Sequence, residues 1–475
     1  MKKIIIAVFF LFTLLSFPLF LFANLKLPAV FTDGMVLQQE SSVAVWGLAS
    51  SNTKVEVLSS WKHQTYTTTS DQQGHWKMNI RTPKAGGPYQ LTIKDDQSKI
   101  TLNNVLIGEV WIASGQSNMA MSMKGFSAKE PILHSDSILA AANNDQIRFF
   151  MAPQTSWAQP MQEYRKSNWN SASPTTARNF SAVAYTFASE LQQKLKVPVG
   201  IIQVAWGGTF IQSWMSAKSL QAFPEVKLLP EKDVAFEDKN TPAGLFNGMI
   251  NPLIGYSIKG VIWYQGEQNV RDPKLYAKLF PLMVKDWRSL WGQNFAFYYA
   301  QIAPWDYKSA NHKAPWLREM QLNALNEIPN AGMAVLTDIG MENTIHPPDK
   351  QTVGKRLSYL ALQQTYRQTK IKAQGPTFHQ LKIKDNQLWL TFKHHEGLYL
   401  TEPESSTFEI AGADQVFYPA QAIINNGEII LTSPKVTKPL AARYAYKGWV
   451  KGNLYNKYGL PASSFRTDNW EIKPQ

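Results

Sequence analysis

VLIGEVWIASGQSNM, residues 105–119, is the stretch that decides the interpretation of the fold. Its first part, 105–113, is a mostly apolar run, and serine and glycine follow directly. An apolar run bounded by such residues is typical of a buried strand that ends in a turn. Further along the chain, apolar runs alternate with segments whose apolar residues recur at helical spacing. This order predicts βαβ units and therefore an α/β core with a mainly parallel sheet.

The expected elements of the core can be placed by residue number. Strands are expected at 105–113, 201–204, 258–264, 295–302 and 333–337. Amphipathic helices are expected at 187–195, 276–290, 317–325 and from about residue 350. The core domain therefore spans about residues 105–370.

Both flanks of the core have a different pattern. Residues 24–104 and 371–475 contain short runs with an alternation of period two, separated by glycine, asparagine, aspartate and proline. This pattern is typical of antiparallel strands joined by turns. It predicts an N-terminal β-sandwich domain at 24–104 and a C-terminal β-rich domain at 371–475.

The N-terminus has the features of a secretory signal. Lys2 and Lys3 precede an apolar run at 4–22, and the small residue Ala23 follows it. We expect residues 1–23 to be a signal peptide, with a secreted or periplasmic mature protein that is not stably inserted in a membrane. The alternative is a retained membrane anchor, because the run approaches the length that spans a bilayer.

Composition excludes several classes of protein. The 475 residues include no cysteine, so disulfide scaffolds and cysteine nucleophiles are excluded. With 44% hydrophobic and 17% charged residues, the chain is unlike a disordered one. The 48 Lys and Arg against 35 Asp and Glu give a net charge of +13, but the basic residues are scattered. Together with the signal sequence, this argues against nucleic acid as a partner.

Polar tracts follow the predicted core strands. Ligands of open α/β sheets bind beyond the carboxyl ends of the strands, and residues 114–119, 205–209, 265–269 and 345–347 fall at such positions. Ser117 lies in the first tract and His346 in the last. Each has an ordinary alternative, a helix N-cap for the serine and a structural role for the histidine. Together they supply the nucleophile and the base that a serine hydrolase needs.

Two further tracts offer groups that could stabilise an oxyanion. The backbone amides of Gly207 and Gly208 could do so, or the pair could simply form a tight turn. Gln265 and Asn269 carry side-chain amides for the same purpose, with loop hydrogen bonding as the alternative. Glu267, beside them, is either a general base or a buried carboxylate that supports the loop.

Metal and cofactor sites are not expected. No group of histidine, aspartate and glutamate has the spacing of metal ligands, and His394 and His395 would point apart on a strand. Trp206 and Trp263 adjoin the site tracts, where they either line the pocket or pack beneath it.

Four motifs in order carry a resemblance to a known family. They are Gly-Gln-Ser-Asn-Met at 115–119, Trp-Gly-Gly-Thr at 206–209, Trp-Tyr-Gln-Gly-Glu at 263–267 and Ile-His-Pro at 345–347. With these motifs the sequence resembles the sialate O-acetylesterase family, carbohydrate esterases of the SGNH hydrolase superfamily. The stretches at 27–38 and 453–468 resemble the start and the end of the family's sequences, so the resemblance covers nearly the whole mature chain.

The resemblance implies a three-layer, SGNH-type (flavodoxin-like) core. It implies Ser117 as the nucleophile and His346 as the base. The implied oxyanion hole consists of the amides of Ser117 and of the Gly207–Gly208 turn, with a side-chain amide from the 265–269 loop.

One position departs from the pattern of the superfamily. Many SGNH enzymes place an aspartate three residues before the histidine, where this chain has Asn343. Glu342 and Asp338 are the local carboxylates that could orient His346. A backbone carbonyl could also hold the imidazole, which would give a Ser-His dyad.

The resemblance implies a secreted serine esterase that removes acetyl groups from O-acetylated sugars such as 9-O-acetylated sialic acid. One alternative is an acetylesterase acting on a polysaccharide such as acetylated xylan. Another is a carbohydrate-binding protein with two β modules around an inactive esterase core. No cofactor is expected for any of the three.

Overall fold

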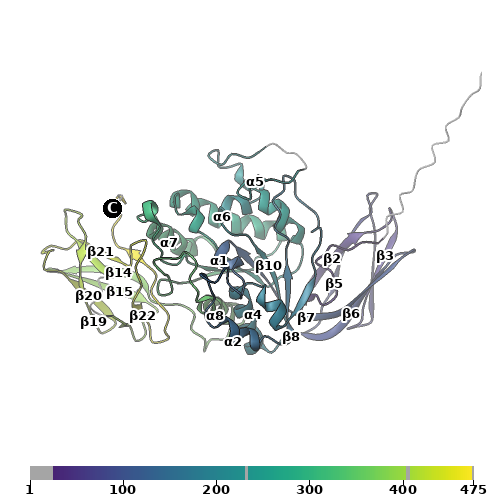
Figure 1. The fold of residues 1–475 in the computed structure, drawn as a ribbon, viewed down its shortest axis with the longest axis horizontal. Helices are drawn as coiled ribbons and strands as arrows, with labels where there is room; N and C mark the ends of the chain where they lie inside the picture. Colours follow the sequence, from purple (N-terminus) through teal and green to yellow (C-terminus); the bar gives the residue numbers. More distant parts are fainter. Residues whose placement is uncertain (1–24, 230–233, 403–406, 473–475) are drawn as a thin grey trace, which may run out of the picture.

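A computed structural model describes residues 25–229, 234–402 and 407–472 of the chain. The predicted signal peptide lies outside these residues. The molecule is elongated, with N-terminal strands at one end, an α/β core in the middle and C-terminal strands at the other end (Figure 1).

A large sheet forms the centre of the core, in the order β13-β12-β11-β7-β10-β8-β9. Every neighbouring pair along it is parallel except β8 and β9. The expectation of an α/β core with a mainly parallel sheet is therefore confirmed. Its strands are β7 (Lys99–Gly115), β8 (Asn144–Met151), β9 (Trp169–Ala172), β10 (Val199–Ala205), β11 (Gly260–Tyr264), β12 (Ala296–Ala300) and β13 (Ala331–Ala334).

Helices cover both faces of this sheet. Successive residues of β7 point to opposite faces: Val110 packs in the cluster that includes α6 and α7, and Trp111 in the cluster that includes α4 and α8. The four helices are α4 (Ala182–Leu195), α6 (Pro273–Trp291), α7 (Ala314–Asn323) and α8 (Lys350–Leu360). Shorter helices are α1 (Ser117–Ala120), α2 (Ser135–Ala140), α3 (Pro174–Arg178) and α5 (Ala217–Leu220).

Local sequence signals explain the long helix α6. The side chain of Asp272 accepts a hydrogen bond from the backbone of Leu275, and Pro273 occupies the first turn. At the other end Gly292 adopts a left-handed conformation, as C-terminal glycines commonly do. The buried face repeats at helical spacing, with Tyr276, Leu279, Phe280, Met283, Val284 and Trp287.

Strand β7 is longer than expected. The expected core strand begins at residue 105, directly after the predicted domain boundary, whereas β7 crosses that boundary. The sequence predicts the boundary at residue 104, where the pattern of short alternating strands gives way to that of the core. Asn104 adopts a positive φ of 54°, yet β7 continues from Lys99 to Gly115. Its first half pairs with β6 and β1, and its second half with β10 and β11. One strand therefore belongs to both the N-terminal unit and the core.

Both flanking units are rich in β structure. The N-terminal strands are β1 (Val36–Gln38), β2 (Ser42–Leu48), β3 (Lys54–Ser59), β4 (Gln64–Thr69), β5 (His75–Arg81) and β6 (Gly86–Lys94). The C-terminal unit has two four-stranded sheets, β14-β15-β20-β19 and β18-β17-β21-β23, around one hydrophobic cluster. Its strands are β14 (Thr377–Lys384), β15 (Gln387–Lys393), β16 (Tyr399–Leu400), β17 (Phe408–Ala411), β18 (Tyr418–Pro419), β19 (Gln421–Asn425), β20 (Glu428–Thr432), β21 (Ala441–Tyr444), β22 (Leu454–Tyr455) and β23 (Phe465–Arg466).

A fully buried arginine joins the C-terminal unit to the core. Arg318 on α7 donates to Ser464 Oγ at 3.1 Å, to the carbonyl of Ala445 at 3.3 Å and to that of Lys447. These oxygens satisfy a guanidinium that burial would otherwise leave unpaired.

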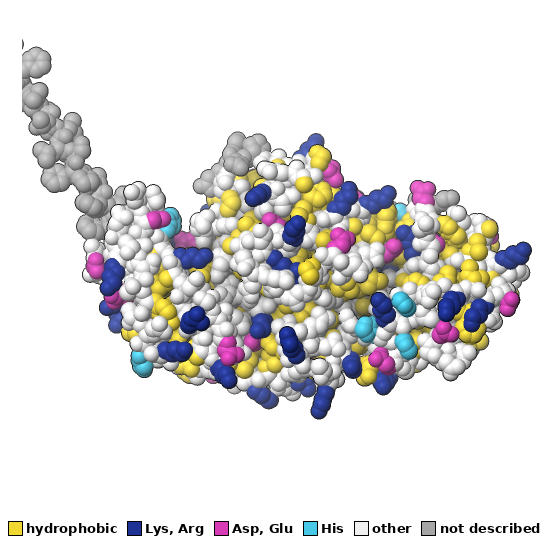
Figure 2. Space-filling view, turned by 180° about the vertical axis from the view of Figure 1, so that it is seen from behind, with side chains coloured by type: hydrophobic (Ala, Val, Ile, Leu, Met, Phe, Trp, Pro, Cys, Tyr) yellow, Lys and Arg dark blue, Asp and Glu magenta, His cyan; other side chains and the backbone are white. Residues whose placement is uncertain are grey.

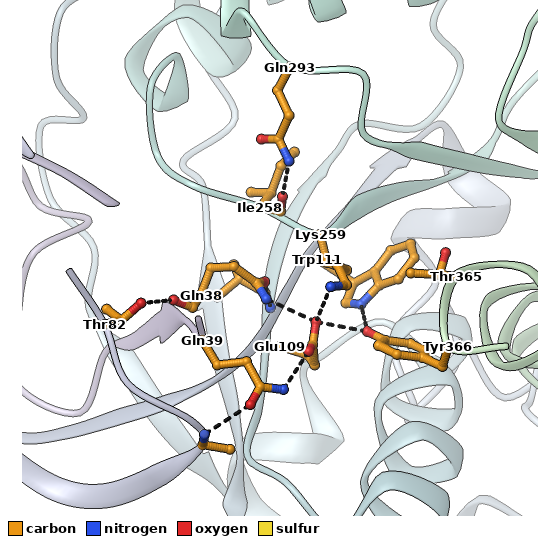
Figure 3. A network of polar contacts seen from close by, with 12 residues as sticks. Gln38, Gln39, Thr82, Glu109, Trp111, Ile258, Lys259, Gln293, Thr365 and Tyr366 are labelled. Atoms are coloured by element: carbon orange, nitrogen blue, oxygen red, sulfur yellow. Dashed lines mark hydrogen bonds and ion pairs between the residues drawn. The ribbon is translucent and has the colours of Figure 1, made fainter. Parts of the chain in front are cut away.

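A second polar network, shown in Figure 3, joins the N-terminal unit to the core. Glu109 of β7 is buried and accepts hydrogen bonds from Gln38 Nε2 at 3.0 Å, Gln39 Nε2 at 2.6 Å and the hydroxyl of Tyr366 at 3.0 Å. The ammonium of Lys259 lies 3.9 Å from the same carboxylate. One side chain thus connects strand β1, the central sheet and the segment that follows α8.

We expect Glu109→Ala to lower the free energy of unfolding by about 3 kcal/mol, because the buried Gln38 and the half-buried Gln39 and Tyr366 would lose their charged acceptor. Urea unfolding measures this change. The exposed Glu40, in the N-terminal unit, is the control, and Glu40→Ala should stay within about 0.5 kcal/mol of wild type. Equal losses in the two variants would contradict the role given to Glu109.

The surface in Figure 2 shows Lys and Arg side chains spread along the whole face, with Asp and Glu between them. On this face the basic residues do not form one continuous patch of the kind that nucleic-acid binding requires.

Over the described residues, no helix has both the length and the apolar character needed to cross a membrane.

Candidate active site

The chain makes a sharp turn between β7 and Ser117. Gly115 has a φ of 138°, and a Cβ at this position would collide with the carbonyl oxygen of Tyr264. Gln116 is the N-cap of α1, so Ser117 is its first helical residue and not the cap. The turn lies where β10 and β11 flank β7 on its two sides, a point at which the order of the sheet reverses.

His346 links Ser117 to a carboxylate. Its Nε2 lies 2.9 Å from Ser117 Oγ, and its Nδ1 lies 2.7 Å from Glu130 Oε1. A carboxylate that accepts from Nδ1–H leaves Nε2 free to accept the hydroxyl proton. The imidazole is only 17% exposed and the Glu130 side chain 31% exposed. The arrangement can move a proton from the serine to the histidine.

Glu130 lies in a tight loop between α1 and α2. Its backbone N–H donates to the carbonyl of Ser127 at 3.0 Å, and its carbonyl accepts from Phe126 at 3.2 Å. Gly125 has a φ of 77°, and a Cβ there would collide with the carbonyl of Glu130. This loop also places the ring of Phe126 edge-on to the imidazole of His346, with the centroids 5.0 Å apart.

The two carboxylates that the sequence suggested for orienting His346 lie elsewhere. Asp338 accepts two hydrogen bonds from Arg356, at 2.7 and 2.6 Å, so its oxygens are engaged with a guanidinium. Glu342 is exposed in the loop that precedes His346. Glu130 was missed because it is 216 residues from His346 in the chain and belongs to no motif. Its one signal is its position, 13 residues after Ser117, in a loop from the same sheet edge.

The Gly207–Gly208 turn lies against Ser117. A Cβ on Gly207 would come 3.2 Å from the Cβ of Ser117, and Gly208 has a φ of 68°. Lys239 donates to the carbonyl of Gly207 at 2.6 Å, and Asn240 donates to that of Gly208 at 3.0 Å. These bonds fix the peptide planes of the turn beside the nucleophile.

Gln265 and Asn269 have different positions in their loop. Gln265 is fully buried, and its Nε2 donates to the carbonyl of Thr209 at 3.0 Å and to Asn269 Oδ1 at 2.7 Å. Both of its N–H groups are therefore used inside the loop, and neither points to Ser117. Asn269 Oδ1 also accepts from the backbone of Ile211 at 3.0 Å, while its Nδ2 donates only to Gln212 Oε1, at 3.3 Å, among the described residues. One N–H of Asn269 remains to donate.

Glu267 contacts the residue that follows the nucleophile in the chain, Asn118. Asn118 Nδ2 donates to Glu267 Oε1 at 2.6 Å. Burial raises the pKa of Glu267. Its contacts are with the support of the site and not with Ser117 or His346, which argues against a role as general base.

The two tryptophans beside the site also differ. Trp263 is fully buried and packs edge-on against Trp214 and Trp287, at centroid distances of 6.0 and 5.9 Å. It therefore packs beneath the site. Trp206 is half-buried at the end of β10.

A cavity of about 380 Å³ opens beside His346. It is lined by Lys129, Glu130, Pro131, Met341, Asn343, Thr344, His346 and Pro348. Two larger hollows border α6 and contain neither Ser117 nor His346, so size alone does not identify the site.

Among the residues that the structure describes, no three His, Cys, Asp or Glu side chains come together as a metal ion would require.

Comparison with known proteins identifies relatives over most of the chain. Residues 107–363 match the model of a family described as carbohydrate esterase, sialic acid-specific acetylesterase. The human sialate O-acetylesterase is 28% identical over 442 residues, which cover 84% of this chain and 83% of that protein. The mouse sialate O-acetylesterase is 27% identical over 485 residues, or 87% and 88% of the two chains.

One solved structure is similar to this chain over a larger part of its length than the human and mouse relatives are. It is that of a carbohydrate acetylesterase from Xanthomonas citri, with a TM-score of 0.86 and 34% sequence identity. The similarity covers 94% of this chain and 100% of that one, so it includes both β-rich flanks as well as the core.

Proposed function

Because the chain belongs to the carbohydrate esterases described as sialic acid-specific acetylesterases, we propose that it hydrolyses O-acetyl esters of sugars, with O-acetylated sialic acids as its substrates. As a member of this family it is a carboxylic ester hydrolase. The observation that carries the proposal is the imidazole of His346, which joins Ser117 Oγ to Glu130. A hydroxyl, an imidazole and a carboxylate in this order form the catalytic unit of serine hydrolases.

In the proposed reaction, Ser117 Oγ attacks the acetyl carbonyl while His346 Nε2 accepts the hydroxyl proton. The tetrahedral intermediate collapses when His346 returns the proton to the sugar oxygen, which leaves as an alcohol. Water then attacks the acetyl-Ser117 ester by the same proton transfers and releases acetate. Throughout, Glu130 holds the imidazole by its Nδ1 and stabilises the imidazolium that forms twice.

The oxyanion of each tetrahedral intermediate requires hydrogen-bond donors that point at the former carbonyl oxygen of the acetyl group. We assign this role to the backbone amides of Ser117 and of the Gly207–Gly208 turn, with the side-chain amide of Asn269. The close approach of Gly207 to Ser117 supports the first two, and the remaining N–H of Asn269 supports the third. Gln265 acts indirectly, because it orients Asn269 through a 2.7 Å hydrogen bond.

We assign the core, about residues 105–370, to the three-layer SGNH type. The strand order of the central sheet and the helices on both of its faces support this assignment. So does the position of Ser117 directly after the strand at which the order reverses.

A polysaccharide acetylesterase is the second candidate. The observation in its favour is the Xanthomonas citri relative, which is described as a carbohydrate acetylesterase without restriction to sialic acid and is more similar in sequence than the human and mouse relatives. Both candidates use the same catalytic groups and differ in the sugar that the cavity accepts. Lys129 lines that cavity and favours a sugar with a carboxylate.

Acetate release from O-acetylated sialic acid and from acetylated xylan separates the candidates. We expect kcat/KM to be about 10-fold or more higher for the sialic acid, because a carboxylate would gain a partner in Lys129. Lys129→Met, compared with the exposed Lys124→Met, should reduce this preference and leave hydrolysis of a neutral acetyl ester unchanged. Release from xylan alone would support the second candidate. A folded protein that binds glycan but releases no acetate would overturn both.

A further inference from the structure

A buried polar cluster lies beneath the Ser117–His346 pair and takes no part in the mechanism above. Its members are Asn118, Glu267 and Lys350, of which Asn118 and Lys350 are fully buried and Glu267 is 7% exposed. Each comes from a different element: Asn118 from α1, Glu267 from the loop after β11 and Lys350 from the first turn of α8.

The hydrogen bonds of this cluster converge on the immediate neighbours of the two reacting residues. Lys350 Nζ donates to Asn118 Oδ1 at 2.6 Å and to the carbonyl of Pro347 at 2.7 Å. Asn118 Nδ2 donates to Glu267 Oε1 at 2.6 Å and to the carbonyl of Ile345 at 3.0 Å. Asn118 follows the nucleophile in the chain, and Ile345 and Pro347 flank the histidine.

Lys350 and Asn118 therefore clamp the histidine loop onto helix α1. The carbonyls on both sides of His346 are held, one by each side chain. The bond between Lys350 and Asn118 couples these two contacts. A movement of the loop away from Ser117 would break hydrogen bonds to a fully buried ammonium, which is costly.

The charge of this cluster is costly for the fold. Burial lowers the pKa of Lys350 to about 7, although the carboxylates of Glu267, Asp349 and Glu130 act to raise it. The amide of Asn118 lies between Lys350 and Glu267, so cation and carboxylate are joined through a neutral group. The ring of Tyr264 is a further neighbour, with its centroid 6.0 Å from the ammonium. Apolar residues of similar size commonly give an equal or more stable core, so stability alone does not account for a buried lysine.

We propose that Lys350 is a positioning residue, which fixes the distance between Ser117 Oγ and His346 Nε2 by holding Asn118 and the carbonyl of Pro347 at the same time. The inference rests on the proposed Ser117–His346 catalysis and adds to it the group that maintains its geometry. Glu267 balances the charge and holds the other N–H of Asn118.

The test is the turnover of Lys350→Met per active site, counted by burst titration with a chromogenic acetyl ester. We expect kcat per titrated site to fall about 10- to 100-fold, because a misplacement of about 1 Å has effects of this size. KM should change less than about threefold, since Lys350 does not touch the substrate cavity. A residue with a purely structural role would lower the number of titrated sites and leave kcat per site unchanged, which would overturn the proposal.

A double variant, Lys350→Met with Glu267→Gln, separates positioning from charge balance. It leaves no unpaired charge in the cluster, so it should fold even where the single variant does not, while the bonds to Asn118 Oδ1 and Pro347 remain absent. Its kcat per site should stay at the reduced value. Recovery to within about twofold of wild type would show that Lys350 serves only to neutralise Glu267 and would overturn the proposal.

Two controls complete the design. Arg318→Met removes another fully buried cation, whose partners all lie in residues 445–464, and should lose stability but keep kcat per titrated site. Ser117→Ala tests the proposed function separately. If Ser117→Ala is inactive while Lys350→Met is as active per site as wild type, only the positioning role falls. If Ser117→Ala remains active, the proposed function falls.

Discussion

Replacement of Ser117 by alanine is expected to lower kcat for hydrolysis of a chromogenic acetyl ester by about 10⁴- to 10⁶-fold. Losses of this size follow removal of the nucleophile from other serine hydrolases, where the remaining rate comes from the oxyanion donors and from binding. The same should hold here, because the hydroxyl is the group that His346 contacts through Nε2, at 2.9 Å. Steady-state assays with the mature protein measure the change directly.

The fold should tolerate this substitution, since Ser117 is only half-buried and is not the N-cap of its helix. Urea unfolding of Ser117→Ala should therefore match wild type within about 0.5 kcal/mol. The double variant Ser117→Ala with His346→Ala should be no more than a few-fold slower than the single one, because residues that act as a unit are not additive. A residual rate above about 1% of wild type would instead place the nucleophile elsewhere.

The sequence was sufficient to predict that Ser117 and His346 meet. Each lies directly after a predicted core strand or before a core helix, and in a parallel sheet the carboxyl ends of all strands share one edge. Their 229-residue separation in the chain is therefore irrelevant to the prediction. The same argument placed the Gly207–Gly208 turn at the site, and the structure brings it against Ser117.

The direction in which a side chain points within a loop could not be predicted from the sequence. Gln265 and Asn269 are equivalent in the sequence, because both follow β11 and both carry an amide. Only the packing of the loop decides that Gln265 turns inward, to Thr209 and Asn269, and that Asn269 keeps one N–H. Nothing in residue type or spacing contains that information.

The prediction of strand boundaries was inaccurate for a related reason. Asn103 and Asn104 have the composition of a turn, yet β7 passes through them as an irregularity, because β6 pairs with Leu102 before them and with Val105 after them. Strands β8 and β9 were not expected at all. Strand β8 begins with polar residues at 144–146, and β9 has only four residues, so neither shows the apolar run that identifies a buried strand.

Glu130 is the strongest case of a tertiary contact that the sequence does not reveal. Asp338 and Glu342 are the carboxylates that lie close to His346 in the chain, which is where many superfamily members carry the acid. In this chain the loop after α1 brings Glu130 to Nδ1 instead, at 2.7 Å, and Asp338 pairs with Arg356. This difference makes a second large effect testable.

Glu130→Gln is expected to lower kcat by about 10³- to 10⁴-fold while KM changes little. An amide that donates to Nδ1 would hold the imidazole in the other tautomer, with its proton on Nε2, and Nε2 could then no longer accept the proton of Ser117. An amide also lacks the charge that stabilises the imidazolium. The equivalent change in a serine protease triad costs about 10⁴-fold, because it leaves the imidazole in the wrong tautomer. Steady-state kinetics of the folded variant, with sites counted by titration, measure the loss.

The matched controls are the two carboxylates that lie closer to His346 in the chain. Glu342→Gln alters an exposed residue and should leave kcat within about twofold of wild type. Asp338→Asn weakens a buried pair with Arg356, so it should lower stability but not kcat per titrated site. The opposite result, a large loss in Asp338→Asn or Glu342→Gln and none in Glu130→Gln, would return the orienting role to the acid expected from the superfamily pattern. Equal activity in all three variants would leave His346 without a required carboxylate and would make the unit a Ser-His dyad.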